Sequence, residues 1–343
     1  MQRSYRCAWG VLAGTLAFSI AFAPAEARAI THARDLAASE YPAVGALLLK
    51  RDGPACGHEV VCTGTLIARD KVITAAHCGA IFGEPPSGEW FFSLELELGL
   101  GADAYQACPS EQVDPGSLRP IAAGGAHPDF AIFPADPATD FDQLFGWDDI
   151  AIWTLDAPID DVAPAALLLG GGLLDGDPLD GELEMVGYGP DLIAGPRRRA
   201  ALTSIVELAA SELRYDGAAQ RCKGDSGGPT FLRSPALAEP ALVSLTSRVY
   251  ELNIDESPCG SIIETRVDAH AGFIRERAPG VREAMAADPG GPGGEESDGG
   301  VGSDGGGCRL GAGSAPAWGL WTLLAGLGLL RRRRDAPGRR RDA

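Results

Sequence analysis

Three side chains in separate segments have the chemistry of nucleophilic catalysis. Ser226 lies in the segment CKGDSGGP, His77 in TAAHC and Asp149 in WDDIAI. A serine hydroxyl is a weak nucleophile that needs a base to take its proton, and the base needs a third group to fix its tautomer and stabilise its protonated form. We therefore expect Ser226 as the nucleophile, His77 as the general base and Asp149 as the carboxylate that orients the base.

Glycines surround the serine in this segment. Gly224, Gly227 and Gly228 allow the backbone to turn tightly around Ser226, because glycine adopts conformations that other residues avoid. In such a turn the N–H groups of Gly224 and Ser226 can converge on a developing oxyanion. The segment therefore predicts an oxyanion hole made by these two residues.

Each segment has a structural interpretation beside the catalytic one. A histidine at the end of a strand is often a satisfied structural residue, an aspartate before an apolar strand is often a cap, and a glycine-rich run is often an ordinary turn. The joint occurrence of the three segments, in the order His77, Asp149, Ser226, favours catalysis.

The elements that must position these residues are short strands. The chain has 343 residues, 45% hydrophobic and 22% charged, which excludes a disordered protein. Gly (46) and Pro (25) make up about a fifth of it, which favours a turn-rich β protein. Short apolar or alternating runs predict an all-β barrel or sandwich; they lie at residues 44–49, 63–68, 72–76, 91–98, 150–155, 183–187, 200–208, 241–247 and 262–267.

Two further predictions concern the rest of this region. A helix is expected after Asp268, which would be its N-cap, with Phe273 and Ile274 on one face and Pro279 at its end. Residues 79–147 are rich in Pro and Asp and poorly patterned, so we expect long loops or insertions there.

The charge of the central region argues against nucleic acid as a partner. The formal net charge of the chain is −18, with 29 basic and 47 acidic residues. Residues 1–29 and 308–343 hold eleven of the basic and three of the acidic residues, so 18 and 44 remain between them, a net charge of −26. This region repels phosphate.

Residues 1–29 have the pattern of a secretory signal peptide. Arg3 and Arg6 precede an apolar run over 8–23, and an Ala-x-Ala cleavage site ends at Ala29. A buried or membrane-spanning helix is the alternative. Export implies an oxidising compartment, and six cysteines between the two ends allow three bridges whose pairing the count leaves open: Cys56, Cys62, Cys78, Cys108, Cys222 and Cys259.

The C-terminal end divides into a linker and a tail. Residues 288–307 are nearly all Gly, Pro, Asp, Glu and Ser, which predicts a flexible linker. In the tail, 308–343, Cys308 precedes an apolar stretch over 315–330 and an arginine cluster, which predicts a membrane tether through a hydrophobic helix. A low-complexity tail of no consequence is the alternative. The order of these parts resembles the MYXO-CTERM sorting tail, which implies that Cys308 is the processing and anchoring point for a sorting protease.

The three catalytic segments together resemble the trypsin/chymotrypsin-like serine endopeptidases, and the likeness runs from Ile30 to about Ala278. It implies a chymotrypsin-like double antiparallel β-barrel with a C-terminal helix, over a domain at 30–287. It also implies hydrolysis of peptide bonds in proteins or peptides through an acyl-enzyme, without a cofactor. The family's aspartate directly precedes a strand of the Ile-Ala-Ile type, which selects Asp149 over Asp148.

The same resemblance implies the disulfides. Cys62–Cys78 would hold the loop that carries His77, Cys222–Cys259 would support the wall of the specificity pocket, and Cys56–Cys108 is the remaining pair.

An activation step is also implied. In the family a new N-terminal amine inserts beside the aspartate that precedes the nucleophile, which here is Asp225. Ile30 directly follows Ala29, so we expect signal peptidase itself to create the Ile30 terminus. The sequence departs from the family at His32-Ala33, where Gly-Gly is usual.

The specificity pocket is implied to involve Gln220, Ser247 and Val249. A trypsin-type pocket would hold an aspartate at the position of Gln220, so a strong preference for Arg or Lys is not expected. Two rival interpretations remain: a catalytically silent homologue that acts as a surface binding module, and a metal-binding surface protein using His58 and His127. The spacing of these histidines fits no compact site, so no metal is expected.

Overall fold

The computed structural model describes residues 30, 32–51, 56–86, 89–106, 109, 111–134, 144–170, 181–189, 195–216, 219–250 and 259–285. All of them belong to the first of two compact units, Met1–Gly291. The predicted signal peptide, linker, anchor tail and Cys308 lie outside the described residues, as do Cys108 and the side chains of Val249 and Cys259. Among the helices of the described residues, none has the length and apolar character needed to span a membrane.

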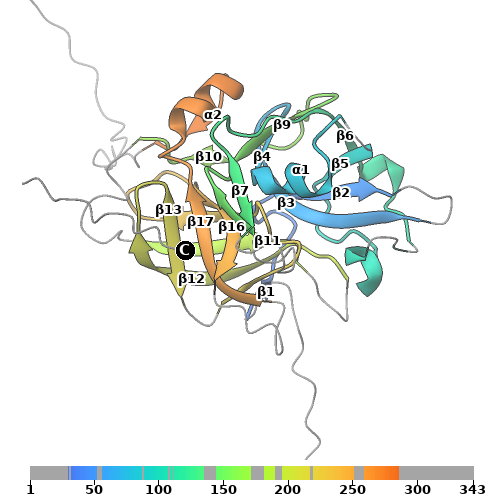
Figure 1. The fold of residues 1–343 in the computed structure, drawn as a ribbon, viewed down its shortest axis with the longest axis horizontal. Helices are drawn as coiled ribbons and strands as arrows, with labels where there is room; N and C mark the ends of the chain where they lie inside the picture. Colours follow the sequence, from blue (N-terminus) through green and yellow to red (C-terminus); the bar gives the residue numbers. More distant parts are fainter. Residues whose placement is uncertain are drawn as a thin grey trace, which may run out of the picture. The chain divides into compact units, whose positions relative to one another are not determined.

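The first barrel is a closed ring of six antiparallel strands. Its strands are β2 (Val44–Lys50), β3 (His58–Ala68), β4 (Lys71–Thr74), β5 (Glu89–Ser93), β6 (Arg119–Ala123) and β9 (Ala151–Leu155). Inside it, the rings of Trp90 and Trp153 meet edge to face with their centroids 4.8 Å apart. Figure 1 shows this barrel on the right, in blue to green.

The second barrel also has six antiparallel strands, and the pairing of β16 with β17 closes it. Its strands are β11 (Glu182–Gly187), β12 (Arg199–Leu208), β13 (Glu212–Asp216), β15 (Pro229–Arg233), β16 (Ala241–Tyr250) and β17 (Cys259–Arg266). Three two-residue strands pair with this barrel: β1 (Arg34–Asp35), β10 (Ala166–Leu167) and β14 (Arg221–Cys222). A fourth, β18 (Arg282–Glu283), pairs with β10.

The two barrels share a core because side chains of a strand point alternately to its two faces. In β2, Leu47 and Leu49 pack with Trp90 inside the first barrel. Leu48 lies in another cluster, which also contains Leu245 of the second barrel. Alternate side chains of β2 therefore pack inside the first barrel and against the second barrel.

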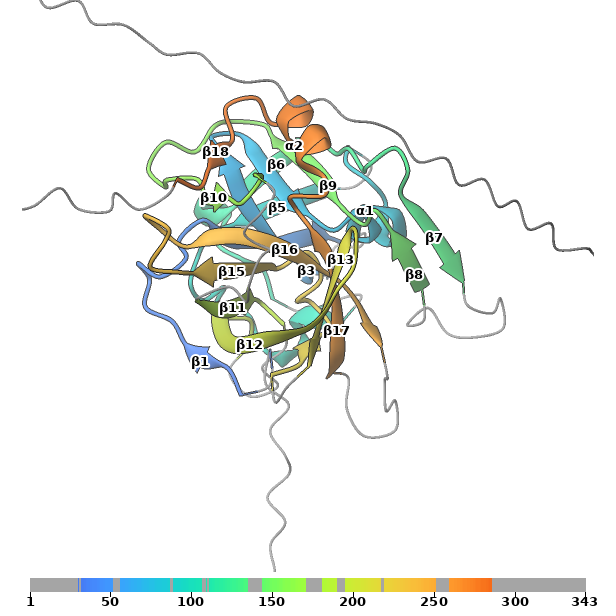
Figure 2. The ribbon, with the colours of Figure 1, turned by 90° about the vertical axis from the view of Figure 1, so that its left-hand side faces the viewer.

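Helices and a hairpin complete the described structure. They are α1 (Ala76–Phe82), α2 (Ala271–Arg277), the 3₁₀ helices η1 (Ala102–Tyr105) and η2 (Pro115–Ser117), and the hairpin of β7 (Ala131–Pro134) and β8 (Leu144–Trp147). Figure 2 shows β7 and β8 side by side at the edge of the molecule. Helix α1 follows β4 directly, so the first barrel carries His77.

The prediction of an all-β protein is confirmed at the level of two closed six-stranded barrels, and each predicted apolar run overlaps a strand. Two expectations were wrong. Besides β5, which the apolar run at 91–98 predicted, residues 79–147 hold β6 and the hairpin of β7 and β8 where only loops were expected. Backbone pairing rather than a local apolar pattern forms these strands: β6 pairs with β5 and β9, and β7 pairs with β8. The N-cap of α2 is His270 and not Asp268, whose carboxylate instead accepts hydrogen bonds from Arg266 at 3.0 and 2.6 Å.

Candidate active site

Asp149 holds His77 by two hydrogen bonds. Its Oδ1 accepts from the backbone N–H of His77 at 2.8 Å, and its Oδ2 lies 2.7 Å from the Nδ1 of the ring. Because an ionised carboxylate can only accept, Nδ1 carries the hydrogen and Nε2 keeps its lone pair. This arrangement presents Nε2 as a base.

The environment of Asp149 keeps it ionised. Burial alone would raise its pKa, but the nearby His77 and the hydrogen bonds from His77 and Ser247 outweigh burial and leave the pKa below its ordinary value. The Ser247 hydroxyl donates to Oδ2 at 2.7 Å. Ser247 was predicted for the specificity pocket, and the structure adds that it contacts the carboxylate of Asp149.

Ser226 lies at the tip of a buried turn between β14 and β15. Gly224, Asp225, Gly227 and Gly228 are all buried, whereas Ser226 keeps part of its surface exposed. Gly227 has a φ of +74°, and a Cβ atom there would lie 2.0 Å from the Oγ1 of Thr74. Only glycine fits this position, so the turn requires it.

The N–H of Ser226 has a fixed direction. The carbonyl of Asp225, in the same peptide unit, accepts from the N–H of Gly228 at 2.8 Å. A trans peptide directs its N–H and C=O to opposite sides. The N–H of Ser226 therefore points away from Gly228, which suits its predicted part in the oxyanion hole. Gly224, the other predicted donor, has a φ of +92°.

Ser226 and His77 lie against the same disulfide. The Sγ of Cys78 is 3.9 Å from the Nε2 of His77 and 3.9 Å from the carbonyl oxygen of Ser226. Among the described residues no hydrogen bond joins the Ser226 hydroxyl to the His77 ring. Catalytic hydrogen bonds in substrate-free sites are often long and tighten with substrate bound, so the shared contact with Cys78 is the structural link between the two residues.

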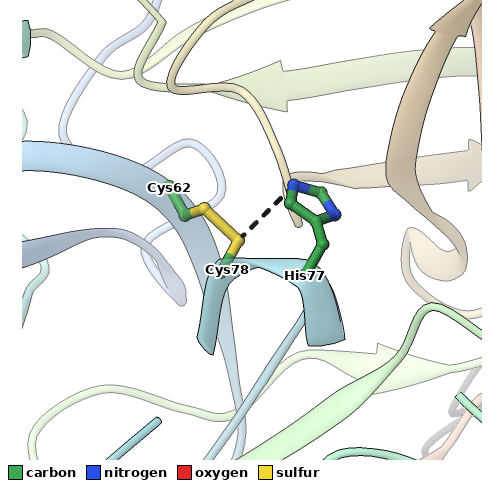
Figure 3. A group of neighbouring side chains, drawn as sticks. All are labelled: Cys62, His77 and Cys78. Atoms are coloured by element: carbon green, nitrogen blue, oxygen red, sulfur yellow. Dashed lines mark hydrogen bonds between the residues drawn. A yellow bond between two sulfur atoms is a disulfide. The ribbon is translucent and has the colours of Figure 1, made fainter. Parts of the chain in front are cut away.

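Cys62, His77 and Cys78 also form the compact group that most resembles a metal site in the described part of the chain, with ligand atoms within 4.8 Å of one another. Figure 3 shows that the two sulfur atoms are bonded to each other. A disulfide offers no thiolate, so this group does not fit a metal ion. His58 and His127 belong to no such group among the described residues.

The Cys62–Cys78 disulfide is the one that the resemblance implied. Cys56 and Cys222 are also disulfide-bonded. The backbone of Cys222 pairs with that of Cys259 between β14 and β17. Cys108 and the side chain of Cys259 are outside the described residues, so the partners predicted for Cys56 and Cys222 stay predictions.

Thr63 and Tyr105 support the serine turn, and the sequence analysis missed both. The Thr63 hydroxyl donates to the carbonyl of Gly224 at 2.9 Å and accepts from the N–H of Tyr188 at 3.1 Å. The Tyr105 hydroxyl lies 2.6 Å from the carbonyl oxygen of Tyr188, and its ring packs beside Gly224. For Thr63, the only sequence feature that could have indicated a role was its position next to Cys62. Tyr105 lies within residues 79–147, where loops were expected.

Ile30 and Asp225 are in contact. The backbone nitrogen of Ile30 lies 3.3 Å from Oδ2 of Asp225, and both residues are fully buried. Asp225 also accepts from the N–H groups of Gly189 at 2.7 Å and Cys222 at 2.9 Å. Burial raises the pKa of Asp225, against the opposing influence of Arg221 and these N–H groups.

Arg221 is a buried cation that the sequence analysis did not single out. It is 0% exposed and pairs with Glu264, also 0% exposed, at 3.0 Å. A Cβ atom on Gly187 would lie 2.1 Å from a carboxylate oxygen of Asp225 and 3.3 Å from Nη1 of Arg221, so the two side chains lie in one region. Two buried carboxylates thus surround one guanidinium.

The predicted specificity residues lie near the site. Gln220 precedes Arg221 and is half-buried, and the backbone of Val249 lies in β16 two residues after Ser247. Between them, Arg248 pairs with Glu212 at 2.6 Å and stacks over Trp147, with its guanidinium 5.5 Å from the ring centroid. This strand therefore differs from the aromatic-glycine strand usual in the family.

Comparison with known proteins adds no relative: no family model matches this chain, and a search of curated proteins finds no match either.

Proposed function

We propose that this protein is an exported serine endopeptidase that hydrolyses peptide bonds through Ser226, His77 and Asp149. The observation that carries the proposal is the hold of Asp149 on His77, at 2.8 Å from the backbone N–H and 2.7 Å from Nδ1. That hold fixes the tautomer in which Nε2 is basic. Ser226, which is partly exposed within a buried turn, contacts the same disulfide through its carbonyl oxygen as Nε2 of His77 does.

The reaction follows from these positions. The Ser226 oxygen attacks the carbonyl carbon of the scissile bond while its proton passes to Nε2 of His77. The N–H groups of Gly224 and Ser226 bind the resulting oxyanion. Collapse of this intermediate breaks the C–N bond, and the leaving amine takes the proton from His77. A water then attacks the acyl-enzyme by the same steps and releases the acid and free Ser226.

Two closed barrels with the catalytic residues at their junction support a chymotrypsin-like architecture with α2 as its C-terminal helix. His77 and Asp149 belong to the first barrel, whereas Ser226 and Ser247 belong to the second. A site built this way needs no cofactor and accepts extended protein or peptide chains.

Activation by the Ile30 amine fits the buried charges. When ionised, the buried side chains of Asp225 and Glu264 would carry two negative charges against the one positive charge of the buried Arg221. A free ammonium at Ile30, beside Asp225, would balance them. Cleavage after Ala29 would supply it on export, and the tail with Cys308 would then hold the enzyme at the cell surface through a membrane helix or a sorting protease.

A fluorophosphonate probe, which reacts with activated serines, tests the proposal. The secreted protein should be labelled, Ser226→Ala should not, and Ser234→Ala, a change on the second barrel outside the site, should be labelled like the wild type. Failure of the correctly processed wild type to react would support the catalytically silent binding module instead.

A further inference from the structure

A second histidine–aspartate contact involves Asp148, the residue next to Asp149 in the chain. Nε2 of His270 is 2.9 Å from Oδ1 of Asp148, the residue before Asp149. Nδ1 of the same ring is 2.7 Å from the carbonyl oxygen of Arg266. His270 is 5% exposed, whereas the side chain of Asp148 is 31% exposed.

The two hydrogen-bond partners of His270 indicate which of its ring nitrogens carry a hydrogen. A backbone carbonyl can only accept a hydrogen bond, and so can an ionised carboxylate. Both ring nitrogens must therefore donate, which requires the doubly protonated, positively charged ring. In a neutral ring the hydrogen bond to Arg266 would keep the proton on Nδ1, and the lone pair of Nε2 would face the carboxylate of Asp148.

Asp148 is held in an unusual backbone conformation. Its φ is +50°, a left-handed value that a non-glycine residue adopts only when its surroundings favour it. The turn continues with a 2.8 Å hydrogen bond from the N–H of Ile150 to the carbonyl of Asp148. The catalytic Asp149 lies between these two residues, so the contact with His270 fixes the turn that carries it.

A second histidine completes this support. The N–H of His127 donates to the carbonyl of Ile150 at 2.9 Å, and its ring meets the edges of His270 and Phe273 at centroid distances of 5.2 and 4.9 Å. Burial, and next the charge of His270, lower the pKa of His127. His127 therefore stays neutral beside the charged ring.

The other charged groups around His270 are engaged elsewhere. Asp268, on the link to α2, pairs with Arg266 at 2.6 Å. Arg277 of α2 stacks over Phe273, with its guanidinium 5.8 Å from the ring centroid. Asp129 lies in the segment after His127, and its carboxylate raises the pKa of the His127 ring against the larger effects of burial and His270. Asp148 is therefore the carboxylate that faces His270.

We propose that His270 is a positioning residue whose doubly protonated ring holds Asp148 and thereby holds Asp149 in place against His77. The role in catalysis rests on the proposed endopeptidase function. Loss of a proton from His270 removes the hydrogen bond to Asp148 and leaves a lone pair facing the carboxylate. Activity therefore falls as the pH rises and this proton leaves.

The protonation is tested without any activity. The chain has five histidines, and the signals of His270 in a nitrogen NMR spectrum of the ring are identified by their loss in His270→Phe. At neutral pH both ring nitrogens of His270 should be protonated. A spectrum with one bare nitrogen at that pH would overturn the proposal.

The catalytic role is tested by pH profiles of kcat and KM with a peptide substrate. His270→Phe keeps a ring against His127 and should lower kcat about tenfold with little change in KM. Asp148→Asn offers both a donor and an acceptor to the ring, so it should make the alkaline fall in kcat smaller than in the wild type, leaving the part due to the Ile30 ammonium. His127→Phe keeps both contacts of His270 and should preserve that fall.

Three results would overturn the positioning role: a wild-type kcat in His270→Phe, an alkaline fall in Asp148→Asn as large as that of the wild type, or a fall in His127→Phe as small as that of Asp148→Asn. If His270→Phe does not fold, the Asp148→Asn profile still decides the role. Failure of the endopeptidase proposal is a separate result, because wild-type protein would then not react with the fluorophosphonate while the NMR spectrum would still report the protons of His270.

Discussion

The backbone N–H of Thr63 donates a 2.8 Å hydrogen bond to the carbonyl oxygen of Ser226, so a strand of the first barrel holds the proposed nucleophile of the second. The Thr63 hydroxyl also donates to Gly224 at 2.9 Å. One residue therefore orients the backbone on both sides of Asp225. Cys62 precedes Thr63 and bonds to Cys78, which is next to His77, so neighbouring residues of one strand contact Ser226 and the helix that carries His77.

Thr63→Val should lower kcat about tenfold, because it removes the hydroxyl that holds the Gly224 peptide while keeping the shape of the side chain. It should also cost about 1–3 kcal/mol of unfolding free energy, since the buried N–H of Tyr188 loses its acceptor. Thr63→Ser keeps the hydroxyl and serves as the control. Peptide hydrolysis and urea unfolding measure both effects, and equal kcat values for the two variants would contradict the orienting role.

Asp149→Asn should reduce kcat by about 10³–10⁴-fold, because an amide can donate to Nδ1 and favour the tautomer with a proton on Nε2. Asp156→Asn, at an exposed position, should have no comparable effect. The pKa of Asp149 lies below its ordinary value, because His77 and the hydrogen bonds from His77 and Ser247 outweigh burial. Its contribution to stability is therefore complete above the unfolded-state pKa and is lost as the pH falls through the lower, folded-state pKa. A stability loss assigned to Asp149 at pH 5 or 6 would contradict this.

A chain that retains Ala29 before Ile30 should lose stability as the pH rises. The pKa of the buried Asp225 is raised, so its contribution is complete below the unfolded-state pKa and is lost as the pH rises through the folded-state pKa. In the protein that begins at Ile30, the ammonium should offset this loss. Melting temperatures between pH 4 and 8 compare the two forms after N-terminal sequencing, and parallel curves would argue against the ion pair.

Arg221→Met should destabilise the fold by about 3–5 kcal/mol, because it leaves Glu264 and Asp225 buried without the guanidinium. Adding Glu264→Gln should recover part of that loss, since the remaining charge is reduced. Urea unfolding of the single and double variants measures the difference. If the double variant were less stable than Arg221→Met, the buried charge of Glu264 would not be the cause of the loss of stability in Arg221→Met.

Replacing Cys62 and Cys78 together by alanine should reduce the unfolding free energy by about 3 kcal/mol, since the bridge closes a sequence separation of 16 residues. Fluorophosphonate labelling should also slow, because the bridge joins the strand that holds Ser226 to the helix that carries His77. The wild type under reducing conditions is the matched comparison. Labelling at the wild-type rate in the double variant would show that the bridge does not position the site.

Local sequence was enough to predict the chemical groups and the class of fold. The segments around His77, Asp149 and Ser226 contain the residue types that nucleophilic catalysis needs. Short apolar runs between turn residues predict strands without knowledge of which strands will pair. The Cys62–Cys78 pairing followed from the resemblance to a family. Strands β6, β7 and β8 escaped prediction because their apolar patterns are weak. β6 forms by pairing with β5 and β9, and β7 and β8 form by pairing with each other.

Only the tertiary structure determined which residues support the catalytic groups. Ser247 meets Asp149 across 98 positions, Thr63 meets Gly224 across 161, and His270 meets Asp148 across 122. Closure of the barrels brings these pairs together. The pattern of apolar residues within one segment does not predict which side chains of other segments it will contact. The sequence on its own determined the reactive groups, whereas the closed barrels determined what orients them, because orientation depends on contacts between segments far apart in the chain.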